Sequence, residues 1–188
     1  WPMKKIAIFA SGEGTNAQNI IDYFRKSATA KVVLIVCNKP QANVLNRAKK
    51  ENIPYIIITR DDFYNSPRVV DALKNAQVDW IILAGFLWLI PENLIHAFPD
   101  KIINIHPALL PKFGGKGMYG MKVHQAVIEA KEKESGITIH YVNNEYDKGN
   151  IILQASCKID PTDTAETLSE KIHVLEKDYL PITIEKLL

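Results

Sequence analysis

Cysteine is scarce in this chain of 188 residues. Its two cysteines, Cys37 and Cys157, are far apart and lack the paired spacing of a zinc site or a redox motif. We therefore expect both to be buried packing residues. A long apolar run is also missing, because the longest one, residues 80–90, is much shorter than the roughly 20 residues that a membrane-spanning helix needs.

The chain has no strong excess of charge of either sign. Its 23 Lys and Arg residues against 21 Asp and Glu give a net charge of +2, which leaves no broad basic surface for nucleic acid or an anionic membrane. We therefore expect small-molecule partners and a monomer or weak homodimer. No secretory signal precedes the first apolar run, which indicates a cytoplasmic protein. Trp1 and Pro2 precede Met3 and are interpreted as a cloning remnant without function.

What the chain does contain is an alternation of strand-like and helix-like segments, typical of a parallel sheet connected by crossover helices. We predict a single α/β domain over residues 3–188, Rossmann-like, with a mostly parallel twisted sheet of about seven strands and helices on both faces. A last helix should begin after Thr164. The predicted strands are residues 5–10, 32–37, 55–59, 80–84 and 101–105, followed by an antiparallel pair at 137–142 and 151–159. The other predicted helices are residues 16–26, 44–51, 69–76 and 91–98.

A turn with two glycines follows the first predicted strand, at residues 11–16, Ser-Gly-Glu-Gly-Thr-Asn. Glycine lets backbone N–H groups approach an anion, and the helix N-terminus adds positive potential, so the turn suits a phosphate. A plain turn capped by Thr15 or Asn16 is the alternative. An NAD site is disfavoured because the third glycine is missing and the second strand ends in Asn38-Lys39 instead of an acidic residue. An NADP reductase, with Lys39 on the extra phosphate, is the other enzymatic hypothesis.

Asn104 and His106 lie at the end of the fifth predicted strand and point to the same face. An amide can stabilise an oxyanion and an imidazole can move a proton, which is what acyl transfer requires. Asp147, on the turn between the last two strands, either orients the imidazole or is an Asx-turn residue before Gly149. His140 is either a partner of this site or a core histidine. We expect no metal, because these residues lack short ligand spacings.

Four motifs in this order resemble those of the phosphoribosylglycinamide formyltransferases, the folate-dependent enzymes of purine synthesis, over nearly the whole chain. The motifs are residues 11–16, 83–86 (Leu-Ala-Gly-Phe), 104–111 (Asn-Ile-His-Pro-Ala-Leu-Leu-Pro) and Asp147 followed by Gly149. The resemblance implies a formyltransferase domain. It would transfer the formyl group of its co-substrate, 10-formyltetrahydrofolate, to the amine of phosphoribosylglycinamide.

The resemblance also implies roles for individual residues. The catalytic trio would be Asn104, His106 and Asp147, with a protonated His106 helping Asn104 to stabilise the oxyanion. The substrate phosphate and ribose would be bound by Gly14, Thr15, Asn16 and Glu176. The folate would be bound by Arg68, Leu87, Trp88, Leu89, Ile90, Asn104, Asn143, Asn144, Glu145, Tyr146 and Asp147.

Two features depart from the family pattern. The stretch from Phe113 to His124 is longer than usual, and Trp88 stands where a basic residue is common. We interpret the glycine-rich segment 112–121 as a mobile loop. Relatives that formylate tRNA or hydrolyse formylfolate carry a second domain, for which we expect no room here. A sugar-nucleotide formyltransferase and a non-enzymatic phosphometabolite-binding module stay open as alternatives.

Overall fold

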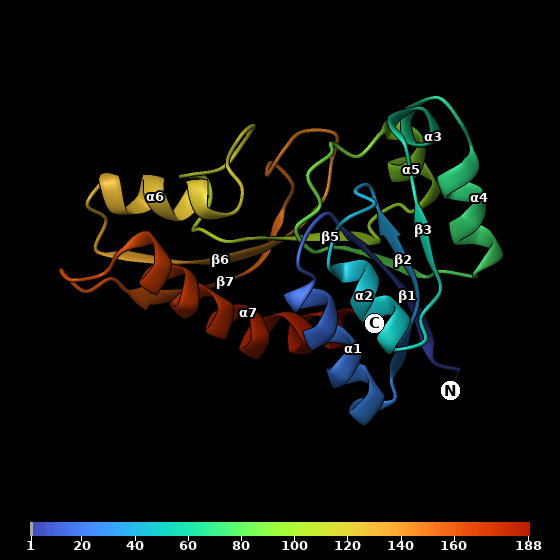
Figure 1. Ribbon diagram of the computed structural model, residues 1–188, viewed down its shortest axis with the longest axis horizontal. Helices are drawn as coiled ribbons and strands as arrows, with labels where there is room; N and C mark the ends of the chain where they lie inside the picture. The colour runs from blue at the N-terminus through green and yellow to red at the C-terminus, as the bar shows by residue number, and fades with distance from the viewer. Residues whose placement is uncertain (1) are drawn as a thin grey trace.

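The computed structural model describes residues 2–188 and contains one sheet with the strand order β3-β2-β1-β4-β5-β6-β7 (Figure 1). Strands β1 to β5 pair in parallel, whereas β6 pairs antiparallel with both β5 and β7. The predicted sheet and its antiparallel pair are therefore confirmed. The strands are β1 (Lys4–Ala10), β2 (Ala30–Cys37), β3 (Tyr55–Ile57), β4 (Trp80–Leu83), β5 (Ile102–His106), β6 (Glu134–Tyr141) and β7 (Ile151–Lys158).

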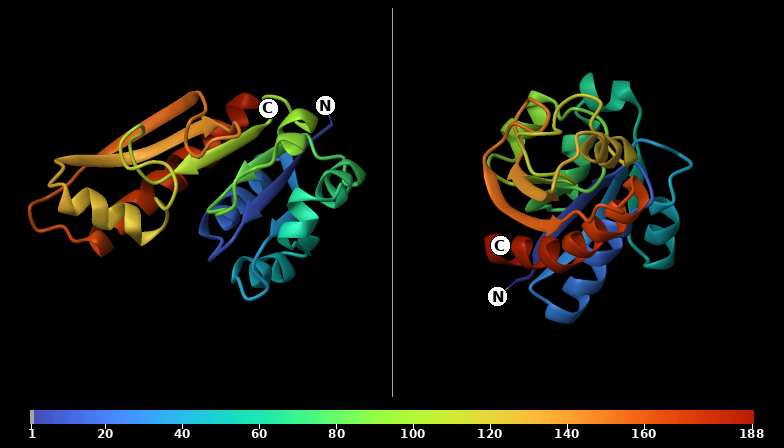
Figure 2. Two further views of the ribbon diagram at one scale, coloured as in Figure 1. Left: turned by 90° about the horizontal axis from the view of Figure 1, so that it is seen from above. Right: turned by 90° about the vertical axis from the view of Figure 1, so that its left-hand side faces the viewer.

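Helices cover both faces of the twisted sheet (Figure 2). Alternate side chains of β1 divide the core in two: Ile6 and Ile8 pack with α1, α2, α6 and α7, while Ala7 and Phe9 pack with α3, α4 and α5. Both layers bury the strands, as a parallel sheet requires. The helices are α1 (Thr15–Ser27), α2 (Val44–Lys50), α3 (Arg60–Tyr64), α4 (Arg68–Asn75), α5 (Glu92–Ala97), α6 (Met121–Glu129) and α7 (Ala165–Leu187).

Two local predictions differ from the structure, and a third is confirmed. Strand β3 stops at Ile57 because Thr59 caps the unpredicted helix α3, accepting a hydrogen bond from the Asp62 backbone N–H while the Asp62 carboxylate accepts one from Thr59. Cys37 is buried as expected, but Cys157 is only half-buried, because it lies on the edge strand β7. The last helix begins as predicted, with Thr164 as its cap.

Ser11 joins the carboxyl ends of three strands at the edge where the candidate site lies. Its hydroxyl donates to Asn38 Oδ1 after β2, at 2.6 Å, and accepts from the Leu87 backbone N–H beyond β4, at 3.0 Å. These bonds fix the segment after β4 beside the turn that precedes α1. Among residues 2–188, no helix is both long enough and apolar enough to cross a membrane.

Candidate active site

A cavity of about 800 Å³ opens at the carboxyl edge of the sheet, between the turn before α1, the segment after β4, the end of β5 and helix α7. Ligands of open α/β sheets bind at this edge. Two of the predicted site residues, Arg68 and Asn144, lie outside the lining. The predicted residues that line the cavity are Gly14, Thr15, Asn16, Leu87, Trp88, Leu89, Ile90, Asn104, His106, Asn143, Glu145, Tyr146, Asp147 and Glu176.

His106 and Asp147 lie side by side inside the cavity. Asp147 Oδ1 is 3.5 Å from His106 Nδ1, and the two side chains are 10% and 4% exposed. On its other side, His106 Nε2 lies 2.7 Å from the carbonyl oxygen of Phe113. A carbonyl only accepts, so Nε2 carries the proton and Nδ1 faces the carboxylate. The second Asp147 oxygen, Oδ2, accepts from the Gly115 backbone N–H at 3.0 Å.

Asn104 is oriented by His140, which lies opposite it on β6. His140 Nδ1 is 2.9 Å from the carbonyl oxygen of Tyr141 and must donate to it, which leaves Nε2 as an acceptor for Asn104 Nδ2 at 3.1 Å. Asn104 Nδ2 also lies 3.5 Å from Asp147 Oδ1. Of the two interpretations of His140, the structure therefore supports a partner of the site.

Burial and neighbouring charges shift the pKa values of the pair in ways that follow from this geometry. Burial lowers the pKa of His106 below its ordinary value, and Asp147 and the Phe113 carbonyl only partly offset that effect. Burial also opposes ionisation of Asp147, but the neighbouring His140 and His106 rings and the Gly115 N–H together hold the pKa of the carboxyl below its ordinary value. At neutral pH the site thus pairs a neutral imidazole with a carboxylate.

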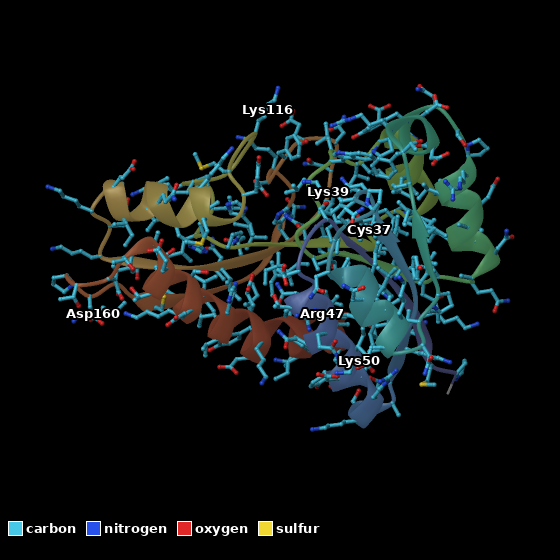
Figure 3. All side chains as sticks on the ribbon, viewed as in Figure 1. Cys37, Lys39, Arg47, Lys50, Lys116 and Asp160 are labelled. Carbon is cyan, nitrogen blue, oxygen red and sulfur yellow. The ribbon has the colours of Figure 1, made fainter. Side chains whose placement is uncertain are left out.

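The other end of the cavity is formed by the turn before α1. Gly14 is the N-cap with φ 78°, and no side chain caps the helix, so its first N–H groups are free for an anion. A Cβ at Gly14 would lie 2.7 Å from Val44 Cγ2, so both the positive φ and the lack of space require glycine here. Lys39 also lines this end, and Lys116 projects outward from the loop before α6 (Figure 3).

Glu176 of α7 faces the same end of the cavity and is 7% exposed. Burial raises its pKa, and a hydrogen bond with the Asn16 side chain partly opposes the rise.

His124 of α6 also lines this cavity and was not predicted from the sequence. Burial lowers the pKa of His124 to about 4, and its Nδ1 atom finds no partner among residues 2–188. A lone histidine on a helix gives no sequence signal for such a position.

The third wall is aromatic and apolar. Trp88 packs with Phe63, Tyr64 and Phe86, and the guanidinium of Arg60 lies 4.7 Å from the centre of the Trp88 ring. Arg60 was not predicted, although it directly follows the cap that begins α3.

The two predicted residues outside the lining have partners elsewhere. Arg68 forms an ion pair with Asp62 and also bonds the carbonyl of Ile57. Asn144 donates to Glu92 at 3.3 Å. Within residues 2–188, no group of three or more His, Cys, Asp or Glu side chains is arranged to hold a metal ion.

Comparison with known proteins identifies the family of this chain. The family model described as formyl transferase matches residues 4–184. The chain belongs to the formyl transferase family. The resemblance inferred from the four motifs is thereby confirmed. Among solved structures, this formyl transferase is similar to glycinamide ribonucleotide transformylase 1 from Geobacillus kaustophilus, with 40% identity, a TM-score of 0.89 and 100% of both chains covered.

Further relatives of this formyl transferase carry related names. Phosphoribosylglycinamide formyltransferase from Bacillus subtilis (strain 168) is 39% identical over 99% of this chain and 95% of its own length. The chloroplastic phosphoribosylglycinamide formyltransferase from Arabidopsis thaliana is 42% identical over 95% of this chain. The chain spans 64% of the length of that plant protein and 56% of the length of its counterpart from Vigna unguiculata.

Proposed function

We propose that this chain transfers the formyl group of 10-formyltetrahydrofolate to the amine of phosphoribosylglycinamide. The observation that carries the proposal is the presence, in one cavity, of Asn104, His106 and Asp147 together with the uncapped N-terminus of α1. Acyl transfer to a phosphorylated amine requires an oxyanion donor, a proton carrier and an anion site. The names of the bacterial relatives support formyl transfer to phosphoribosylglycinamide.

The ribonucleotide is proposed to bind with its phosphate at the start of α1. The N–H groups of Gly14, Thr15 and Asn16 would bind the phosphate without a basic side chain, since the helix terminus itself carries positive potential. Glu176 lies beside Asn16 and offers a carboxyl group to a ribose hydroxyl. The amine then points toward His106 and Asp147.

The folate is proposed to lie along the aromatic and apolar wall. Residues 87–90 and 143–147 would hold its pteridine ring from two sides, since Tyr146 Oη bonds the Leu87 carbonyl at 3.3 Å and closes this part of the cavity. The acidic tail requires a cation at the rim. Arg60 stacks on Trp88 at this wall, whereas Arg68 is paired with Asp62, so we assign the tail to Arg60.

The reaction begins with attack of the substrate amine on the formyl carbon, which places negative charge on the formyl oxygen. Asn104 keeps one Nδ2 hydrogen on His140, and the other, which faces Asp147 Oδ1 at 3.5 Å, would move to this oxyanion. His106 starts neutral because burial lowers its pKa, which differs from the protonated ring expected from the resemblance.

Proton transfer then returns the site to its starting state. His106 Nδ1 takes the proton that the amine nitrogen loses, and Asp147 stabilises the imidazolium that results. The imidazolium gives that proton, directly or through one water, to the nitrogen of the departing tetrahydrofolate as the carbon–nitrogen bond breaks. The ring is neutral again when the products leave.

The test is to mix the protein with 10-formyl folate and phosphoribosylglycinamide and to follow folate deformylation and the formylated product together. Equal, amine-dependent formation of both products is the expected result. Deformylation without the amine would instead indicate a hydrolase. Transfer to an amino-sugar nucleotide but not to phosphoribosylglycinamide would replace the proposed acceptor, and binding without turnover would favour the binding-module alternative.

A further inference from the structure

The loop between β5 and α6 touches both members of the catalytic pair through its backbone. The carbonyl of Phe113 accepts from His106 Nε2 at 2.7 Å, and the N–H of Gly115 donates to Asp147 Oδ2 at 3.0 Å. We propose that segment 113–115 is a positioning element for catalysis, which fixes the ring tautomer of His106 and the rotation of Asp147. This inference rests on the proposed function.

The bond to Phe113 decides which nitrogen of His106 reacts. With the proton of the neutral ring held on Nε2, the lone pair is on Nδ1, the nitrogen that lies 3.5 Å from Asp147 Oδ1. The opposite tautomer would place a lone pair against a carbonyl oxygen at 2.7 Å. Segment 113–115 thus keeps the basic nitrogen of His106 on the side of the ring that faces Asp147, where the reacting amine is proposed to bind.

The bond to Gly115 holds Asp147 in the matching orientation. With Oδ2 fixed by the backbone N–H, the side chain cannot turn, and Oδ1 stays within 3.7 Å of His106, His140 and Asn104. Asp147 has φ 54°, a backbone conformation that aspartate tolerates better than most residues.

The segment is built to approach this closely. A Cβ on Gly114 would lie 2.4 Å from Leu110 Cδ2 and 3.4 Å from Asp147 Cβ, so a larger residue here would have to displace the Leu110 side chain. The start of the loop is fixed, because Thr138 accepts from the Leu110 N–H and Gln154 donates to the Leu110 carbonyl. These bonds hold Leu110, just before the loop, against β6 and β7.

A loop that merely covered the cavity would affect substrate KM, whereas a positioning loop affects kcat and its pH profile. Gly115→Ala and Gly117→Ala are matched variants, because both residues have positive φ, +93° and +85°, and open space where the Cβ would go. Both introduce similar backbone strain. Only Gly115 is bonded to Asp147. The other titratable groups that face the pair, His140 of β6 and His124 of α6, stay unchanged in both variants.

We expect Gly115→Ala to lower kcat by about tenfold or more, because small displacements of reacting groups are costly. The acidic limb of its kcat profile should move to higher pH, since Asp147 loses a donor that favours its ionised form. In Gly117→Ala the acidic limb of the kcat profile should lie at the same pH as in the parent, even if kcat itself changes. Replacing Gly115 by glycolic acid, which exchanges its N–H for an ester oxygen, should reproduce the shift of the limb without the strain.

An NMR titration separates failure of this inference from failure of the proposed function. Without any substrate, ¹⁵N shifts should place the proton of neutral His106 on Nε2, and the Asp147 carboxyl should titrate at higher pH in the Gly115 variants than in the parent. A proton on Nδ1, or unchanged Asp147 titration in both Gly115 variants, would overturn the inference. A parent that lacks formyl transfer but shows these NMR results would overturn the proposed function alone.

Discussion

Asparagine in place of Asp147 keeps the size of the side chain and removes its charge. Its amide oxygen can still accept from the Gly115 N–H, so the change isolates the charge that faces His106 at 3.5 Å. An opposite charge at this distance raises an imidazole pKa by about 1–3 units, so its loss should lower the pKa of His106 by that amount. One unit corresponds to about 1.4 kcal/mol, and the imidazolium formed during the reaction should lose about 1.4–4 kcal/mol of stabilisation.

This loss predicts that kcat of Asp147→Asn falls by about 10- to 1,000-fold, with a much smaller change in the KM of the ribonucleotide. The assay is steady-state formyl transfer over a range of pH, together with an NMR titration of His106 in parent and variant. Asp100→Asn is the matched control, because Asp100 has nearly the same φ, 56° against 54°, and lies on an exposed turn. Equal titration midpoints of His106 in the parent and in Asp147→Asn would refute the reasoning.

Three further predictions address the two ends of the cavity. Burial raises the pKa of Glu176, so ionising its carboxyl destabilises the fold as pH rises from the ordinary pKa of 4.5 through the raised value. Glu176→Gln should therefore raise Tm at neutral pH and leave it unchanged well below pH 4.5. The same variant should weaken ribonucleotide binding in calorimetry. Gly14→Ala should raise the KM of the ribonucleotide by about tenfold through strain and its clash in the α1 turn, whereas Gly12→Ala, with open space at its Cβ, should change it little. Arg60→Ala should raise the KM of the folate, whereas Arg68→Ala should lower Tm and leave that KM unchanged; the reverse result would return the folate tail to Arg68.

The sheet could be predicted from sequence because its strands are apolar runs separated by helices of the right length. The boundary after β3 could not, because the apolar run continues past the point where the chain turns. Thr59 and Asp62 form a capping box with aspartate in the third position instead of the more familiar glutamate or glutamine. In the sequence this weak helix-start signal stands beside a strong apolar pattern, which favoured a longer strand.

The candidate site was predictable where it depends on strand geometry. Asn104 and His106 are two residues apart on β5, so alternation alone places both on one face. Asp147 lies on a turn, and its approach to His106 depends on how β6 and β7 pair. The residues alone left Asp147 open between an orienting carboxylate and an Asx-turn residue, and the resemblance to a family favoured the first. The roles proposed for Phe113 and Gly115 belong to backbone atoms, which no residue type reveals.

The charges of the cavity also explain how a substrate would be oriented in it. Burial favours the neutral forms of His106, His124 and Glu176, lowering the pKa of both histidines and raising that of the carboxyl. The Gly115 N–H and the neighbouring His140 and His106 rings lower the pKa of Asp147, so its carboxyl is ionised at neutral pH. The cavity therefore has a carboxylate at one end and the positive N-terminus of α1 at the other. A molecule with an amine at one end and a phosphate at the other matches this polarity in one direction only, which places its amine beside His106.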